Sequence, residues 1–297
     1  MLSRHGTKRI RQQPQPAVLL DALAMNTVAE DIDFPLLGEK EAQAAVSGAL
    51  TLRRVSKTYQ VDGKPLKVLE NIDLEVAPGE FITLVGTSGC GKSTILRLAV
   101  GLDADFDGEI SLDGQPITGP GLERSIVFQE PRLLPWLTVE ANILIALDTT
   151  RYSSAERRRT VAEHIGLVGL KGFEKAYPRQ LSGGMAQRAA IARGLVTRPE
   201  ILLLDEPLGA LDSLTRTYLQ QELLRIWRQQ QVTIVMVTHD VEEAVFLSDK
   251  IVVLTPRPGR VKKTVEIDLP HPRNRVDPVF GALRKQVLEY LADDYSI

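Results

Sequence analysis

A glycine-rich segment that ends in lysine and serine has the residue types and spacing best suited to chemistry. Residues Gly86 to Ser93 read Gly-Thr-Ser-Gly-Cys-Gly-Lys-Ser, which fits the phosphate-binding pattern G-x-x-x-x-G-K-[ST]. Glycines let the backbone approach a ligand closely, and successive amides at a helix N-terminus attract anions. The pattern predicts that Lys92 binds the β- and γ-phosphates of a nucleotide and that the Ser93 hydroxyl binds Mg²⁺.

The segments on both sides of this loop are those that such a loop requires. Phe81 to Val85 is an apolar run typical of a buried strand, and Ile95 to Gly101 follows a helical pattern. A glycine-rich surface turn is the alternative, and these flanking elements disfavour it. We interpret Cys90, the one cysteine of the sequence, as a small filler of the loop rather than as a redox group.

A second glycine-rich turn, from Leu181 to Arg188, contains Ser182, Gly183 and Gly184. It is predicted to open a helix from Ala189 to Arg198, so its serine and amides would form another anion site. The phosphates of one nucleotide do not need two such anion-binding sites. The sequence therefore suggests that the second site serves a neighbouring molecule.

The apolar run from Ile201 to Leu204 ends in two carboxylates, Asp205 and Glu206. Such a run is typical of a buried parallel strand, and ligands gather at the carboxyl ends of these strands. We expect Asp205 to hold Mg²⁺ and Glu206 to polarise an attacking water molecule. Because adjacent strand residues point to opposite faces, Glu206 must lie at the start of the following loop to serve the same site.

Two further residues and one segment have both a functional and a structural interpretation. His239 follows the apolar run from Val232 to Val237, and this position favours a catalytic or γ-phosphate-sensing role over a structural one. Tyr59 lies between the first two predicted strands, where it could stack on a nucleobase or pack in the core. The proline-flanked segment from Gln129 to Trp136 could dock a partner or belong to the local core.

Composition limits the class of protein. The net charge of −2 gives no basic field for nucleic acid, and no apolar run approaches the ~20 residues that span a bilayer. We therefore expect a cytosolic chain that reaches a membrane only through a partner. Residues 1–48 have the composition of a mobile N-terminal extension, and 281–297 are predicted to form a C-terminal helix.

The order of these motifs resembles that of ATP-binding cassette (ABC) ATPases. The shared features are the loop at 86–93, Gln129, the turn at 181–188, Asp205-Glu206, Ala210-Leu-Asp212 and His239. The resemblance covers about residues 50–255 and implies an α/β fold, with an ABC ATPase domain at 49–280. This domain would have a P-loop NTPase (RecA-like) parallel-sheet core, an N-terminal antiparallel β subdomain and an inserted helical subdomain at about 132–190.

The resemblance also implies a role for each site residue in binding ATP and Mg²⁺. Catalysis would depend on Glu206, His239 and Lys92, and Mg²⁺ would be bound by Ser93, Gln129 and Asp205. The residues implied to contact ATP are Tyr59, Gly86, Thr87, Ser88, Gly89, Cys90, Gly91, Lys92, Ser93, Thr94, Gln129, Ser182, Gly183 and Gly184. In this family the serine–glycine–glycine turn of one subunit closes over ATP held by the other, which implies a homodimer.

Finer features are similar to those of importers of the nitrate, sulfonate and taurine type, and most of all to the aliphatic-sulfonate importers. They lie at 128–136, 206–216, 240–245 and 255–260. The implied partners are two transmembrane permease subunits and, indirectly, an extracytoplasmic solute-binding protein, with the chain peripheral on the cytoplasmic face of the inner membrane. Nitrate or taurine remain alternative solutes. An ABC ATPase that acts on DNA or ribosomes is a more distant alternative, and we expect no nucleic-acid partner.

Overall fold

The computed structural model describes residues 47–292, and these residues all belong to one structural unit, Ala45–Ile297. The predicted extension at 1–48 lies almost wholly outside the described residues, as do the last residues of the predicted helix at 281–297. Between 47 and 292, no helix has both the length and the apolar character needed to cross a bilayer.

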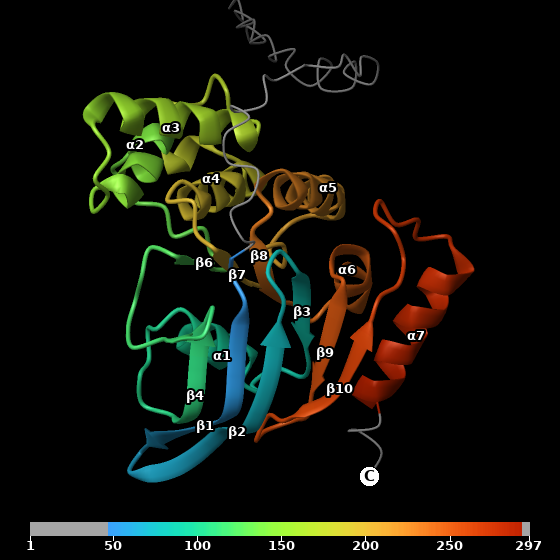
Figure 1. Ribbon diagram of the computed structural model, residues 1–297. Helices are drawn as coiled ribbons and strands as arrows, with labels where there is room; N and C mark the ends of the chain where they lie inside the picture. Colours follow the sequence, from blue (N-terminus) through green and yellow to red (C-terminus); the bar gives the residue numbers. More distant parts are fainter. Residues whose placement is uncertain (1–46, 293–297) are drawn as a thin grey trace, which may run out of the picture. The chain divides into compact units, whose positions relative to one another are not determined.

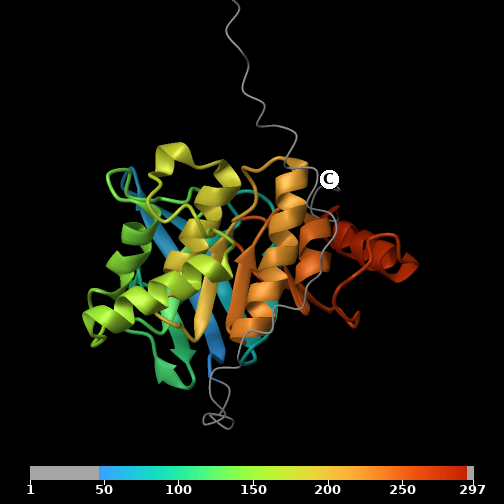
Figure 2. The ribbon, with the colours of Figure 1, turned by 90° about the horizontal axis from the view of Figure 1, so that it is seen from above.

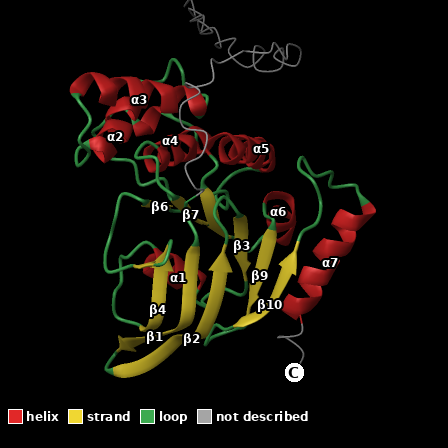
Figure 3. Ribbon diagram, viewed as in Figure 1, coloured by secondary structure: helices red, strands yellow, loops and turns green. Residues whose placement is uncertain are grey.

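Two sheets form the framework (Figures 1 and 3). The four-stranded antiparallel sheet has the order β2-β1-β4-β5, and the six-stranded sheet has the order β10-β9-β3-β8-β7-β6. Neighbours in the larger sheet run parallel, except that β10 is antiparallel to β9. The strands are β1 Leu50–Val61, β2 Lys64–Val76, β3 Phe81–Val85, β4 Asp107–Leu112, β5 Gln115–Pro116, β6 Arg124–Val127, β7 Ile201–Asp205, β8 Thr233–Val237, β9 Lys250–Leu254 and β10 Val261–Glu266. The predicted parallel core and N-terminal antiparallel sheet are confirmed.

Seven α-helices surround the larger sheet in the described part of the chain. They are α1 Lys92–Ala99, α2 Val139–Leu144, α3 Ser154–Leu167, α4 Gly183–Leu195, α5 Ser213–Gln230, α6 Val241–Leu247 and α7 Pro278–Ala292, with short 3₁₀ turns at Ile145–Leu147 and Pro178–Gln180. Helices α2, α3 and α4 gather at one end, beyond β6 (Figure 1). Seen from above, α5 and α6 lie side by side, and α7 lies at the outer edge (Figure 2).

The central strands read as continuous apolar runs because both faces of the larger sheet are covered. Phe81 and Leu202 pack in a core shared with helices α2 to α7. Their neighbours Ile82 and Leu203 pack in a second core, shared with α1 and the antiparallel sheet. Alternate side chains thus enter opposite cores. Packing on both faces holds these strands in place, and with them the polar residues that follow their carboxyl ends.

Side-chain caps mark where several helices begin. Ser153 and Glu156 form the capping box that starts α3. The predicted start of the next helix at Ala189 is wrong, because α4 already begins at Gly183. Ser182 caps it by accepting a hydrogen bond from the Met185 amide at 3.3 Å, which satisfies an otherwise unpaired donor and draws the glycines into the first turn.

Candidate active site

The glycine-rich loop joins β3 to α1 and takes backbone conformations that glycine favours. Gly89 has φ of 78° and Gly91 has φ of 106°, in the left-handed region. A methyl group built on Gly91 would lie 2.4 Å from Leu69 Cδ2. Any larger residue would therefore clash with the antiparallel sheet and distort the loop.

Lys92 and Ser93, the first residues of α1, lie at the base of this loop. The buried Lys92 ammonium donates to the Gly86 carbonyl at 2.8 Å and to the Thr87 carbonyl at 3.0 Å. Ser93 Oγ donates to Asp205 Oδ1 at 2.8 Å. The loop and the end of β7 thus lie in contact.

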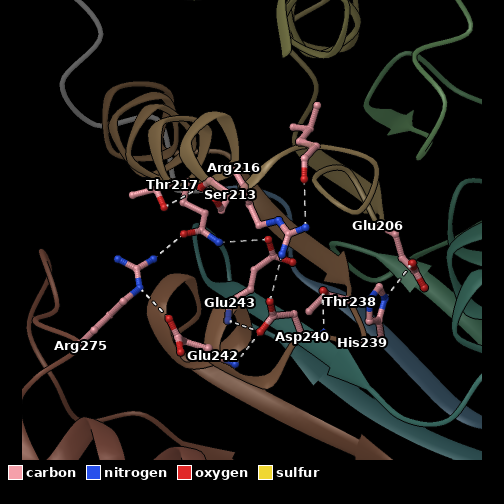
Figure 4. Close-up of polar contacts among 12 residues, drawn as sticks. Glu206, Ser213, Arg216, Thr217, Thr238, His239, Asp240, Glu242, Glu243 and Arg275 are labelled. Carbon is pink, nitrogen blue, oxygen red and sulfur yellow. Dashed lines mark hydrogen bonds and ion pairs between the residues drawn. The ribbon is translucent and has the colours of Figure 1, made fainter. Parts of the chain in front are cut away.

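Glu206 lies one residue beyond the end of β7, where the sequence analysis requires it. Its φ of 46° is in the left-handed region, and its amide donates to the Val237 carbonyl at 2.9 Å. Its side chain meets His239, with Nδ1 3.0 Å from Oε2 (Figure 4). The carboxylate is 26% exposed and the imidazole 64% exposed, so both can reach a ligand that arrives from solvent.

The oxygen donors around Asp205 suit a hard cation. Burial raises the pKa of Asp205, and the hydrogen bond from Ser93 only partly opposes this effect. A cation beside the carboxylate would offset that burial cost. Residues 47–292 contain no cluster of three or more His, Cys, Asp or Glu side chains that could hold a metal ion. The Ser93 hydroxyl and the Asp205 carboxylate are oxygen donors of the kind that Mg²⁺ takes, together with waters and phosphate oxygens.

Gln129 lies close to the Glu206 carboxylate. A methyl group built on Gly209 would lie 3.2 Å from Gln129 Nε2 and 3.6 Å from Glu206 Oε2. Both side chains therefore border the same short loop after β7. The position is compatible with the predicted contact of Gln129 to a metal ion or its water shell.

Tyr59 lies apart from these residues, on β1. Its ring is half-buried against the second core, and its hydroxyl donates to Asp103 Oδ2 at 3.2 Å. The Lys57 ammonium lies 4.8 Å from the ring centroid and pairs with Asp103 at 2.9 Å. Packing against the second core thus accounts for part of the ring, and the side chain is not fully buried.

The serine–glycine turn is separate from the phosphate loop. Ser182 and Gly183 are exposed, while Gly184 packs against Thr215. Among residues 47–292, no hydrogen bond or ion pair joins Ser182, Gly183 or Gly184 to the loop at 86–93. The structure thus brings together Lys92, Ser93, Asp205, Glu206, Gln129 and His239, and in this described part of the chain the serine–glycine turn makes no such contact with them.

Sequence reasoning missed a residue that braces the phosphate loop from outside. Arg257 Nε donates to the Gly89 carbonyl at 3.0 Å. The turn that carries Arg257 is held against β2 by Gly259, whose amide donates to the Val68 carbonyl at 2.8 Å. In the sequence, the segment at 255–260 shows only a similarity to one group of importers. No local pattern predicts that its arginine reaches a carbonyl 168 positions away.

Comparison with known proteins identifies the family. A family model described as ABC transporter matches residues 69–209. The aliphatic sulfonates import ATP-binding protein SsuB of Bacillus subtilis is 50% identical over 240 residues, which cover 81% of this chain and 93% of that protein. The chain belongs to the ABC transporter ATP-binding proteins. As a member of this family it is an ABC-type ATPase.

Two further relatives place the chain within the ABC family. The bicarbonate transport ATP-binding protein CmpC of Synechococcus elongatus is 50% identical over 250 residues, which cover 82% of this chain and 38% of CmpC. An ATP-binding cassette solved as a dimer in a post-hydrolysis state with ADP and Pi is 32% identical. Its TM-score is 0.65 over 74% of this chain and all of that one. The fold is therefore that of an ABC ATPase cassette.

Proposed function

We propose that this chain is the ATP-hydrolysing subunit of an ABC importer and couples ATP binding and hydrolysis to uptake of a small anionic solute, an aliphatic sulfonate. One observation carries the chemical part of the proposal. The Ser93–Asp205 and Glu206–His239 pairs lie beside each other at one sheet edge, next to a phosphate loop. The likeness to SsuB supports the solute class, with nitrate or taurine as alternatives.

ATP binding is proposed to use the backbone amides from Gly86 to Thr94 and the Lys92 ammonium. That ammonium, which now contacts two loop carbonyls, would turn to the β- and γ-phosphates. The Tyr59 ring would stack on adenine. Mg²⁺, held by Ser93, Asp205 and Gln129, would neutralise phosphate charge.

Hydrolysis is proposed to depend on the pair formed by Glu206 and His239. Glu206 would accept a hydrogen bond from the attacking water and align it with the γ-phosphate, while His239 would fix the carboxylate and contact the γ-phosphate. Phosphoryl transfer needs little covalent chemistry from the protein. Positioning and charge stabilisation would therefore supply most of the rate.

The serine–glycine turn is proposed to complete the site of a second copy of the chain. Ser182 and Gly183 are exposed at the N-terminus of α4, a position that favours an anion. A related cassette was solved as a dimer with ADP and Pi. Two ATP molecules would lie between two chains, each held by the loop of one and the turn of the other.

The proposed membrane partners are two permease subunits, with a solute-binding protein acting through them. The segment from Gln129 to Trp136 would transmit closure to the permeases, since Trp136 is 69% exposed and Gln129 lies near the Glu206 carboxylate. The chain would sit at the cytoplasmic face of the inner membrane. We propose no nucleic-acid partner.

The test replaces one functional group at a time. Glu206→Gln should lower kcat for ATP by about 10²- to 10⁴-fold, as loss of a general base does, while ATP affinity is kept. Lys92→Ala should lose ATP binding, measured by calorimetry with Mg²⁺. Glu163→Gln, on α3 and outside the site, is the control. A normal rate in Glu206→Gln would show that this carboxylate is not the base.

A further inference from the structure

Arg216, in the first turn of α5, contacts two loops that each carry a group of the active site (Figure 4). Its Nη2 donates to the Leu211 carbonyl at 3.1 Å, in the loop that begins at Glu206. Its Nη1 lies 3.6 Å from Asp240 Oδ2, and Asp240 follows His239 directly. The guanidinium is a rigid fork whose donors keep a fixed geometry. It therefore sets the distance between these two loops.

The residues on either side of His239 are held firmly. The Asp240 amide donates to the buried Thr238 hydroxyl at 3.1 Å. Asp240 Oδ1 caps α6 by accepting from the amides of Glu242 at 2.9 Å and Glu243 at 3.2 Å. The other carboxylate oxygen, Oδ2, is the one that faces Arg216. Any shift of Asp240 toward or away from Arg216 therefore moves the backbone of His239.

The loop after β7 is a compact turn up to Leu211. The Gly209 amide donates to the Glu206 carbonyl at 3.2 Å, and the Leu211 amide donates to the Leu208 carbonyl at 3.3 Å. Asp212 then caps α5 by accepting from the Thr215 amide at 3.0 Å. The hydrogen bond from Arg216 to Leu211 thus fixes the far end of the loop whose near end carries Glu206.

The Arg216 and Asp240 side chains are partly exposed, at 34% and 35%, and they border two buried polar residues. Glu243 is 3% exposed, and Gln220, which donates to it at 3.3 Å, is 4% exposed. Burial raises the pKa of Glu243, although hydrogen bonds to Thr238 and Gln220 oppose the shift. Within residues 47–292, Arg216 Nε is buried and has no hydrogen-bond partner.

We propose that Arg216 is a positioning residue for ATP hydrolysis: by joining Leu211 to Asp240, it holds Glu206 and His239 at their contact distance of 3.0 Å. The inference rests on the proposed roles of Glu206 and His239 and adds a residue that touches neither ATP nor Mg²⁺. It follows that loss of Arg216 impairs the chemical step and spares nucleotide binding.

The first experiment compares Arg216→Met and Arg216→Lys in full-length protein. Arg216→Met should lower kcat by about 10- to 100-fold, the scale expected when a reacting group is misplaced by up to 1 Å. KM and the calorimetric Kd for ATP should stay within twofold of the wild type. Arg216→Lys keeps the charge and loses the fork, so it should recover part of kcat. A residue that only stabilises the fold would not separate kcat from KM in this way.

The second experiment tests the partner. Asp240→Asn keeps a good helix cap and removes the charge that faces Arg216, so it should lower kcat as Arg216→Met does. The double variant should be no slower than either single variant, because both disrupt one interaction. Should Arg216→Met fail to fold, Asp240→Asn alone decides, and a normal kcat in it overturns the proposal.

The control is Arg225→Met, on the same helix. Arg225 also donates to a carbonyl, that of Leu167, and pairs with Glu222 at 2.8 Å, but it faces neither loop. A folded Arg216→Met variant that matches Arg225→Met in kcat overturns the inference. If Glu206→Gln also turns over ATP normally, the proposed role of Glu206 as the base fails as well. An inactive Glu206→Gln beside an active Arg216→Met overturns the inference alone.

Discussion

Glu206 owes its place in the active site to a backbone conformation that few side chains adopt. Its φ of 46° costs on the order of 1–3 kcal/mol in a residue other than glycine. The amide's hydrogen bond to Val237 and the contact of the side chain with His239 hold it there. Strain of this kind is typical of functional sites. It sets the second carboxylate on the same edge as Asp205.

A buried histidine in α3 gives a prediction about pH. His164 is 5% exposed, and its Nδ1 lies 2.8 Å from the Thr160 carbonyl. Burial lowers the pKa of His164, and the hydrogen bond opposes this only in part. In the unfolded chain the imidazole has a pKa of about 6.5. Below that pH the imidazole therefore binds a proton more readily in the unfolded chain than in the folded protein. Stability from the neutral imidazole is present above pH 6.5 and is lost as the pH falls.

The measurement compares the wild type with His164→Leu by urea unfolding at pH 7.5 and 5.5. The wild type should lose up to about 1.4 kcal/mol relative to the variant between these two values. The difference in unfolding free energy between the two proteins removes the contribution of the other titrating groups, which both proteins share. A gap in unfolding free energy that does not change with pH would contradict the argument.

At the scale of elements, a buried asparagine ties α2 to the exposed segment that precedes it. Asn142 is fully buried. Its Nδ2 donates to the carbonyls of Leu134, Leu137 and Thr138, and its Oδ1 accepts from the Leu134 amide at 2.7 Å. The Asn142 side chain thus satisfies backbone groups of residues 134–138, the segment that contains Trp136. These bonds give a proposed docking segment a fixed shape.

Asn142→Ala should lower the free energy of unfolding by about 2–4 kcal/mol, because it leaves several buried backbone groups unpaired. It should also raise the hydrogen-exchange rate of the Leu134 amide. Thr138→Ala is the matched control, since Thr138 only caps the same helix through the Ala141 amide and should cost about 1 kcal/mol. Equal losses in the two variants, with unchanged exchange at Leu134, would argue against this role.

The sequence predicts elements better than it predicts the links between them. The strands that end at Asp205 and Val237 are predictable, because their apolar runs and polar ends reflect burial on both faces. The start of α4 is not, since glycine-rich composition suggests a turn and the Ser182 cap overrides it. Arg216, Arg257 and Asn142 escape prediction because each contacts main-chain carbonyls. A carbonyl has no sequence signature.

At the scale of the whole molecule, the phosphate loop and the serine–glycine turn belong to separate parts of one chain. The loop forms its contacts with β7 through Ser93 and Asp205, while Ser182 and Gly183 are exposed at the start of α4. We propose that a second copy supplies the turn that completes each ATP site. A site shared between chains can be tested by mixing chains that are damaged in different parts.

The most direct measurement is ATPase activity after mixing Lys92→Ala with Ser182→Arg. The first variant lacks a working phosphate loop and keeps its turn, and the second has the reverse defect, so each should be nearly inactive alone. A mixed dimer would contain one intact site, from the loop of the Ser182→Arg chain and the turn of the Lys92→Ala chain. The account predicts activity well above the sum of the separate variants. A mixture that is no more active than that sum would contradict it.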